Sequence, residues 1–141
     1  MQQLQKEFPN CHYGATTLIN GRDEKRLGEA VAQAAQDGVT LQAAAFDAAD
    51  PTSAKTLAAL AERHGRLDVF VSNVGARNRK PLFDFTLEEI HALLQTDLVG
   101  PFVLAREAAR LMVPRRTGRI ILITSVAGPF ARAGDAAYTA A

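Results

Sequence analysis

Short apolar runs alternate with longer amphipathic segments along most of this chain. The apolar runs are rich in branched residues, and between them apolar residues recur at helical spacing. The predicted strands are 15–19, 39–46, 68–72 and 119–124, and the predicted helices are 23–37, 53–64 and 86 to about 112. Strands that are separated by helices pair in parallel through right-handed crossovers, so the pattern predicts an α/β domain.

Local signals mark several element ends. Gly38 follows the first helix where a left-handed cap is needed, and Asp50-Pro51 closes the loop after the second strand. Thr86 and Glu89 have the spacing of a capping box and predict the start of a long helix. We expect that helix to be bent or locally adjusted at Gly100-Pro101.

Composition limits the class of protein. The 141 residues are 48% hydrophobic and 22% charged, which is typical of one ordinary domain. Sixteen basic and fifteen acidic residues give a net charge of +1, so neither nucleic acid nor a membrane is an expected partner. The single Cys11 cannot form an internal disulfide, and no apolar run reaches the roughly 20 residues of a membrane span. These features predict a cytoplasmic protein, and the scattered histidines predict no metal site.

Small and polar residues follow all four predicted strands. In a parallel sheet these ends share one edge, which is where such sheets bind ligands. They are Gly21 and Arg22, Asp47 and Ala48, the segment 72–75, and Ser125. A nucleotide-sized ligand would use such an edge, although turns favour the same residue types for conformational reasons.

Three stretches carry a family resemblance. They are the segment 67–75 (LDVFVSNVG), the segment 96–102 (TDLVGPF), and Ser125 at the end of a strand with Tyr138 thirteen positions later. Together they resemble the short-chain dehydrogenase/reductase family of Rossmann-fold oxidoreductases. Segments 19–24 and 73–82 look most like its gluconate 5-dehydrogenase-type members.

The resemblance implies a partial fold. Residues 14–141 are expected to form part of an NAD(P)-binding, Rossmann-like, doubly wound parallel sheet, and residues 1–13 stay an unassigned tail. In the family's strand order 3-2-1-4-5, the first strand, its glycine-rich turn and the C-terminal strands have no counterpart here. We therefore expect two strand pairs with unpaired edges.

The resemblance also assigns three catalytic candidates. Tyr138 matches the general acid/base, Ser125 matches the hydroxyl that steadies charge on the substrate oxygen, and Asp97 stands where the family usually has a relay asparagine. From the residues alone, each has an alternative without a catalytic role. Ser125 could cap a turn, Tyr138 could be a core aromatic, and Asp97 could be a solvent-facing helical residue. The lysine that the family places four positions after its tyrosine would follow Ala141.

The cofactor candidates lie at the strand ends. Asp47 matches an adenine ligand, and Arg22 can pair with a ribose 2′-phosphate while Gly21 fills the position of an acidic residue, so NADP is favoured over NAD. The complete set implied by the resemblance is Gly21, Arg22, Asp47, Ala48, Asn73, Val74 and Gly75. Arg22 as a solvated side chain and Asp47 as a turn former remain alternatives.

The expected function is hydride transfer between NADP(H) and a secondary alcohol or ketone, such as a sugar acid or polyol. Without a phosphate loop or lysine, we expect this chain by itself to bind NADPH poorly and to react slowly. The alternatives are a non-catalytic fragment that pairs with itself or another protein, and an incomplete sequence of an active enzyme. A homo-oligomer is compatible with the family, and the basic cluster of Arg77, Arg79 and Lys80 is expected to be a solvated face.

Overall fold

The computed structural model describes residues 15–141, which divide into two compact units, one ending at Asp47 and the other spanning Ala48–Ala141. Each unit is described by itself. The interpretations of residues 1–13, including Cys11 and His12, lie outside the described residues.

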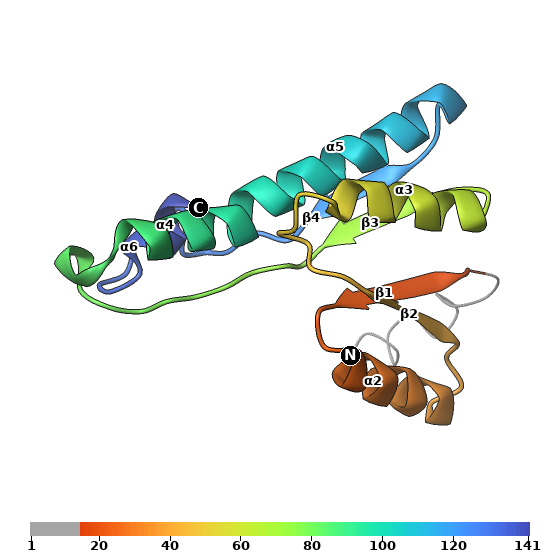
Figure 1. Cartoon of the computed structure of the whole chain (residues 1–141), viewed down its shortest axis with the longest axis horizontal. Helices are drawn as coiled ribbons and strands as arrows, with labels where there is room; N and C mark the ends of the chain where they lie inside the picture. The colour runs from red at the N-terminus through yellow and green to blue at the C-terminus, as the bar shows by residue number, and fades with distance from the viewer. Residues whose placement is uncertain (1–14) are drawn as a thin grey trace. The chain divides into compact units, whose positions relative to one another are not determined.

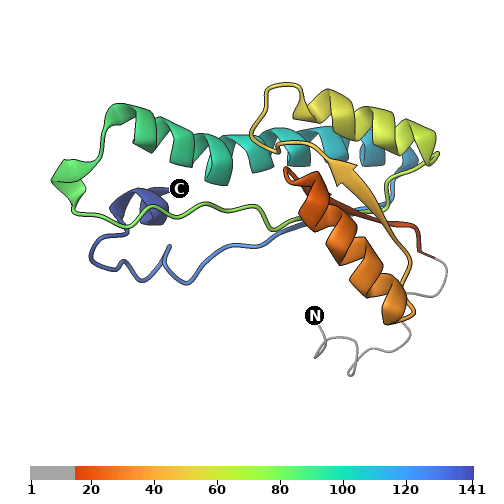
Figure 2. The ribbon, with the colours of Figure 1, turned by 60° about the horizontal axis from the view of Figure 1, so that its bottom comes forward.

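The first unit is one strand-helix-strand motif. Strand β1 (Thr17–Gly21) and strand β2 (Leu41–Ala45) pair in parallel, and helix α2 (Glu24–Gln36) joins them and packs on the pair (Figure 2). Asp23 caps α2 by accepting a bond from the Arg26 backbone N–H at 3.1 Å. Leu27 is the buried residue of this helix, so one apolar side chain anchors it.

The predicted boundaries of these strands were wrong by about two residues. β1 continues through Asn20 and Gly21 because the Asn20 side chain donates bonds of 2.9 Å to the carbonyls of both Ala44 and Phe46. β2 begins late because the Val39 N–H still bonds the Ala34 carbonyl at the end of α2. Gly38 has a φ of 75°, which confirms the predicted left-handed cap.

The second unit packs helices on a second parallel pair. Strand β3 (Val69–Ser72) pairs with strand β4 (Arg119–Leu122), with Val69 opposite Arg119 and Ser72 opposite Leu122. Helix α3 (Ser53–Arg63) lies beside helix α5 (Gly100–Met112), and α5 contacts both strands (Figure 1). A short helix, α6 (Ala136–Ala140), carries Tyr138.

The predicted long helix is continuous but changes its pitch. Helix α4 (Leu87–Leu94) passes through a π-helical turn, η2 (Gln95–Val99), into α5. The capping box of Thr86 and Glu89 is present, which confirms the predicted start. The adjustment occurs just before Gly100, and the Gln95 side chain donates a 2.9 Å bond to the Ala49 carbonyl there.

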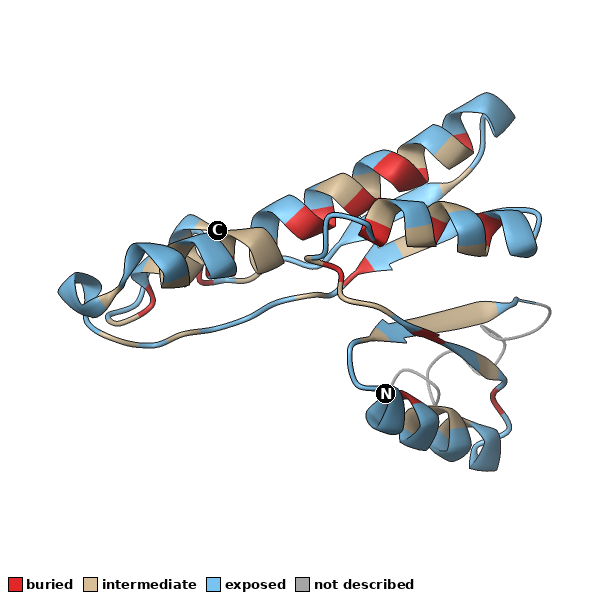
Figure 3. Cartoon of the chain, viewed as in Figure 1, coloured by how far each residue is buried: buried red, intermediate tan, exposed pale blue. Residues whose placement is uncertain are grey.

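Two short 3-10 turns complete the second unit, η1 (Leu82–Asp84) and η3 (Val113–Arg115). Its buried apolar residues lie along the facing sides of α3 and α5, where Figure 3 shows a band of buried positions. They include Leu57, Ala61, Leu104, Ala108 and Met112. This band holds the helices that support β3 and β4.

The two strand pairs agree with the partial parallel sheet that the resemblance implied. Within residues 15–141, β1 pairs with β2 and β3 pairs with β4, and no described strand links the pairs. None of the helices in the described part is both long and apolar enough to cross a membrane.

Candidate functional site

In the first unit, the cofactor candidates Gly21, Arg22 and Asp47 lie at the carboxyl ends of β1 and β2. Gly21 is the last residue of β1, and a Cβ there would make only ordinary contact with Leu27, at 3.4 Å. The Arg22 guanidinium lies 3.6 Å from the Asp47 carboxylate, and 76% of the Arg22 side chain is exposed. The resemblance assigned Asp47 to the adenine and Arg22 to the ribose 2′-phosphate. These two side chains are neighbours, and the Arg22 guanidinium is open to solvent.

Ala48 begins the second unit and is buried, so any contact that it makes with a ligand would come from its backbone. A Cβ on Gly100 would lie 2.6 Å from the Ala48 carbonyl oxygen. The absence of that Cβ lets the loop after β2 rest against the start of α5.

The loop after β3 is open. Asn73 and Gly75 are exposed, Val74 is half-buried, and the preceding Ser72 is buried. A Cβ on Gly75 would meet no atom within 4 Å outside its neighbours, and its φ is not left-handed. The packing of the protein therefore does not require glycine at this position.

Asp97 projects from η2 to the loop after β3. Its Oδ1 accepts a 2.6 Å bond from the Ala76 backbone N–H, whereas its Oδ2 is buried and has no hydrogen-bond partner in the described residues. Burial raises the pKa of this carboxyl, opposed by the Ala76 bond. The alternative that Asp97 merely faces solvent is wrong.

Ser125 lies three residues after the end of β4, which stops at Leu122 and not at residue 124 as predicted, and it lies in a tight turn. Its Oγ accepts a 3.1 Å bond from the Ala127 N–H, as in the alternative that treated it as a turn cap. The hydroxyl hydrogen is not used by that bond. Ser125 can therefore cap the turn through its oxygen and donate its hydroxyl hydrogen to a substrate oxygen at the same time.

Tyr138 is half-buried on α6, and its ring lies beside a cation. The guanidinium carbon of Arg77 is 5.1 Å from the ring centroid. Arg77 also forms a two-pronged ion pair with Asp135, which has no exposed surface, and Arg79 Nε donates to the same carboxylate at 3.2 Å. The hydrogen bond from Arg77 is the main reason that the pKa of Asp135 falls to about 2.

The neighbouring Lys80 is paired as well. Its ammonium bonds the Glu89 carboxylate, which also accepts from Asn78 at 3.3 Å, and the pKa of Glu89 falls to about 2, mainly because of Lys80. The Lys80 backbone N–H donates to the Gly134 carbonyl at 3.1 Å. The expectation that Arg77, Arg79 and Lys80 form a merely solvated face was wrong, because all three are ion-paired. The two arginines pair with Asp135, and Lys80 pairs with Glu89.

No hydrogen bond joins Ser125 to Tyr138 in residues 15–141, so their joint action on one substrate oxygen stays a prediction. Sequence reasoning missed Asp135 entirely. An acidic residue three positions before a tyrosine gave no signal without the arginines that fold onto it.

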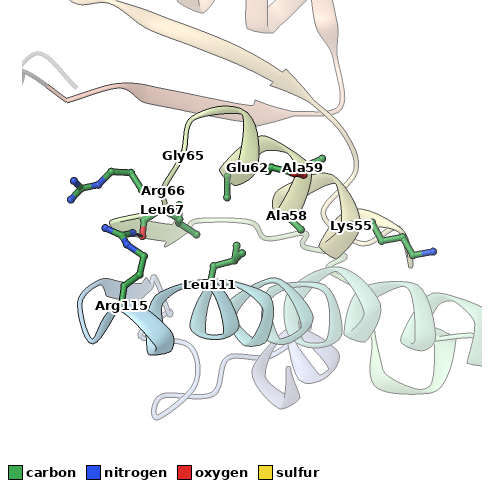
Figure 4. Close-up of a pocket in the computed structure, with 10 residues that line it drawn as sticks. Lys55, Ala58, Ala59, Glu62, Gly65, Arg66, Leu67, Leu111 and Arg115 are labelled. Atoms are coloured by element: carbon green, nitrogen blue, oxygen red, sulfur yellow. Dashed lines mark hydrogen bonds between the residues drawn. The ribbon is translucent and has the colours of Figure 1, made fainter.

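A cavity of about 540 Å³ lies elsewhere in the second unit (Figure 4). It is formed by one side of α3, the loop that follows this helix, the end of α5, and η3. Its wall includes Lys55, Ala58, Leu67, Leu111 and Arg115. None of the candidate site residues lines it, so it is separate from the site.

Comparison with known proteins is consistent with this geometry. The sequence profile of the short chain dehydrogenase family matches residues 10–141. Gluconate 5-dehydrogenase of Gluconobacter oxydans is 34% identical over 131 residues, covering 92% of this chain and 51% of the relative. A 2-dehydro-3-deoxy-D-gluconate 5-dehydrogenase of Formosa agariphila is 27% identical, covering 91% of this chain and 49% of the relative.

Solved structures give the same result. A putative gluconate dehydrogenase from Agrobacterium tumefaciens superposes with a TM-score of 0.83 at 34% identity, covering 90% of this chain and 51% of that one. A gluconate 5-dehydrogenase from Burkholderia cenocepacia, in complex with NADP and tartrate, has a TM-score of 0.80 at 34% identity, covering 90% of this chain and 50% of that one. The chain spans about half the length of these relatives.

Proposed function

The chain belongs to the short chain dehydrogenase family, and from this premise we propose that it provides the NADP-binding and catalytic half of an oxidoreductase that interconverts a secondary alcohol and a ketone. When bound, NADP(H) supplies or accepts the hydride, while the protein orients the substrate and handles the proton. The observation that carries the proposal is Ser125 in the turn that follows β4 and Tyr138 on α6, in a chain that matches the family over residues 10–141.

The donor set fits the adenosine end of NADP. The exposed Arg22 guanidinium can pair with a 2′-phosphate, and Asp47 can accept a bond from the adenine amino group. The open space at Gly75 leaves room for a ligand beside the backbone. These features support NADP over NAD.

Two hydroxyls provide the proton chemistry. Tyr138 exchanges a proton with the substrate oxygen, and Ser125 donates a bond to the same oxygen as charge develops on it. Asp97 holds the Ala76 N–H and so fixes the start of the loop that carries Arg77 and Arg79. This arrangement supports acid-base catalysis at a single substrate oxygen.

A sugar acid or polyol is the proposed substrate class. Two of the relatives are named for gluconate-type substrates, and one solved relative contains tartrate, a hydroxy acid. In this chain, Arg79 bonds Asp135, three positions before Tyr138, and 58% of the Arg79 side chain is exposed. A carboxylate on the substrate would find a cation there.

Cofactor selection is tested with Arg22→Gln. We expect the NADPH affinity, followed by NADPH fluorescence, to fall about tenfold or more while the NADH affinity changes little, because only NADPH carries the 2′-phosphate. Arg26→Gln removes an equally exposed arginine of the same unit and is the control. Equal loss for both cofactors would contradict the assigned role.

Catalysis is tested with Tyr138→Phe, which removes only the phenol oxygen. We expect a loss of turnover of at least about 100-fold with a sugar acid and NADP, since a positioned acid/base contributes that much. Tyr13→Phe removes the only other tyrosine and is the matched control. Undiminished turnover in Tyr138→Phe would overturn the proposal.

A further inference from the structure

A clamp of Arg77 and Asp135 joins the loop after β3 to the start of α6. Arg77 Nε donates to Asp135 Oδ1 at 3.0 Å, and Nη2 donates to Oδ2. The two residues are 58 positions apart in the sequence. Their contact therefore exists only in the folded chain.

The clamp is rigid for two reasons. Asp135 has no exposed surface, and a buried carboxylate that loses its cation is strongly unfavourable. The planar guanidinium fork meets both carboxylate oxygens at once, which determines its orientation. The backbone bond from Lys80 to Gly134 holds the same two segments together.

The clamp sets the position of Tyr138 because α6 is too short to be stable by itself. A helix of five residues depends on tertiary contacts for its stability. The Thr139 N–H bonds the Asp135 carbonyl at 2.8 Å, so Asp135 begins the first helical turn. Tyr138 follows three positions later, on the same side of the helix.

The same guanidinium also faces the tyrosine ring. Its central carbon lies 5.1 Å from the ring centroid, within the range of a cation–π contact. The contact therefore links the position of the ring to that of Arg77.

We propose that Arg77 is a positioning residue for Tyr138: its ion pair with buried Asp135 holds a cation over the ring and fixes the helical turn that presents the phenol. This inference deepens the proposed function and rests on it for its catalytic meaning. The geometry of the clamp itself does not depend on it.

Other charged groups surround α6. The loop after β3 contributes Arg79, which shares Asp135, and Lys80, which pairs with Glu89. Helix α4 packs on α6 and contributes the acidic and titratable side chains Glu88, Glu89 and His91. Arg77 is the cation that contacts the ring among the described residues, so its removal changes the environment of Tyr138 most.

The sequence permits a direct spectroscopic test. The chain has no tryptophan and two tyrosines, so Tyr13→Phe leaves Tyr138 as the single tyrosine, whose band lies at longer wavelength than that of phenylalanine. In that background we compare Arg77→Gln, Asp135→Asn and the control Arg132→Gln, an exposed arginine of the loop before α6. The readout is the near-ultraviolet circular dichroism of Tyr138.

We expect Arg77→Gln to diminish the near-ultraviolet signal of Tyr138, with Arg132→Gln unchanged. Asp135→Asn keeps both arginines but breaks the clamp, and we expect the same loss of signal. Far-ultraviolet circular dichroism establishes that each variant is folded. If Arg77→Gln unfolds the chain, Arg77→Lys, which keeps the charge without the fork, provides the comparison and should also diminish the signal.

An unchanged near-ultraviolet signal in folded Arg77→Gln would overturn the inference, whatever the activity. Full turnover in Tyr138→Phe would instead overturn the proposed function and leave the spectroscopic comparison valid. In an active preparation, we expect Arg77→Gln to lower kcat more than it raises KM, because the misplaced group is the acid/base and not a substrate ligand.

Discussion

At the scale of single residues, Asp97 has one satisfied oxygen and one buried oxygen without a partner in the described residues. Burial raises the pKa of this carboxyl, so the folded chain binds its proton more tightly than the unfolded chain. Its contribution to stability is therefore most favourable in acid and is lost as pH rises through the unfolded and then the folded pKa.

Replacement of Asp97 by Asn tests this reasoning. Asparagine can still accept from Ala76 but has no charge to bury. We expect the unfolding free energy at about pH 7 to rise by less than about 1 kcal/mol, since the group is partly exposed, and the gain to vanish in acid. Urea unfolding at both pH values measures it, and Asp97→Ala, which loses the Ala76 bond, should be destabilised instead.

Asp135 and Glu89 have the opposite pH dependence. Ion pairs lower the pKa of Asp135 from 3.8 to about 2, first through Arg77, and that of Glu89 from 4.5 to about 2, first through Lys80. Both contribute stability above their unfolded values, and that stability is lost as pH falls from about 4.5 to about 2.

We therefore expect the thermal midpoint to decline steeply over this acid range. Lys80→Gln should make the decline shallower, because it removes the main cause of the low Glu89 pKa. Arg106→Gln, an exposed arginine of α5 with no resolved effect on these acids, is the control. Identical slopes in Lys80→Gln and the parent would refute the assignment.

At the scale of elements, two helical glycines have opposite roles. A Cβ on Gly100, at the junction of η2 and α5, would approach the Ala48 carbonyl oxygen to 2.6 Å, whereas a Cβ on Gly28, in α2, meets nothing within 4 Å. Gly100 lets a loop pack on the helix, and Gly28 only lowers helix propensity.

The same substitution should thus change stability in opposite directions. We expect Gly28→Ala to stabilise the chain by about 0.5–1 kcal/mol, and Gly100→Ala to destabilise it by about 1–3 kcal/mol through overpacking. Chemical denaturation followed by circular dichroism measures both. A stabilising Gly100→Ala would mean that the loop after β2 does not pack on α5 in solution.

At the scale of the whole chain, apolar strand residues remain exposed. Val71, Ile121 and Leu122 are each between 45% and 53% exposed, and the described strands form two-stranded pairs with unpaired edges. Such edges pair readily with other strands.

We expect the 141-residue chain to associate as its concentration rises, measured by light scattering. Ile121→Lys should reduce the association because charge on an edge strand opposes pairing. Val113→Lys replaces a residue that is 70% exposed but lies outside the strands, so it serves as the control. A monomer at every concentration would contradict the role of the edges.

Local patterns were sufficient for the elements and for the family. Helical spacing, the box of Thr86 and Glu89, and Gly38 depend on neighbours in sequence, so these features were readable in advance. The strand ends were less accurate, because Asn20 extends β1 through bonds to residues more than twenty positions away.

The site divides along the same line. The family resemblance was sufficient to propose Ser125, Asp97 and Tyr138 as site residues, whereas it could not predict their surroundings. Only the fold brings Ala76 to Asp97, and only the fold buries Asp135 under Arg77 beside Tyr138. Chain periodicity reports local preference, but ion pairs and burial between distant segments depend on how those segments pack, so the tertiary structure alone decided them.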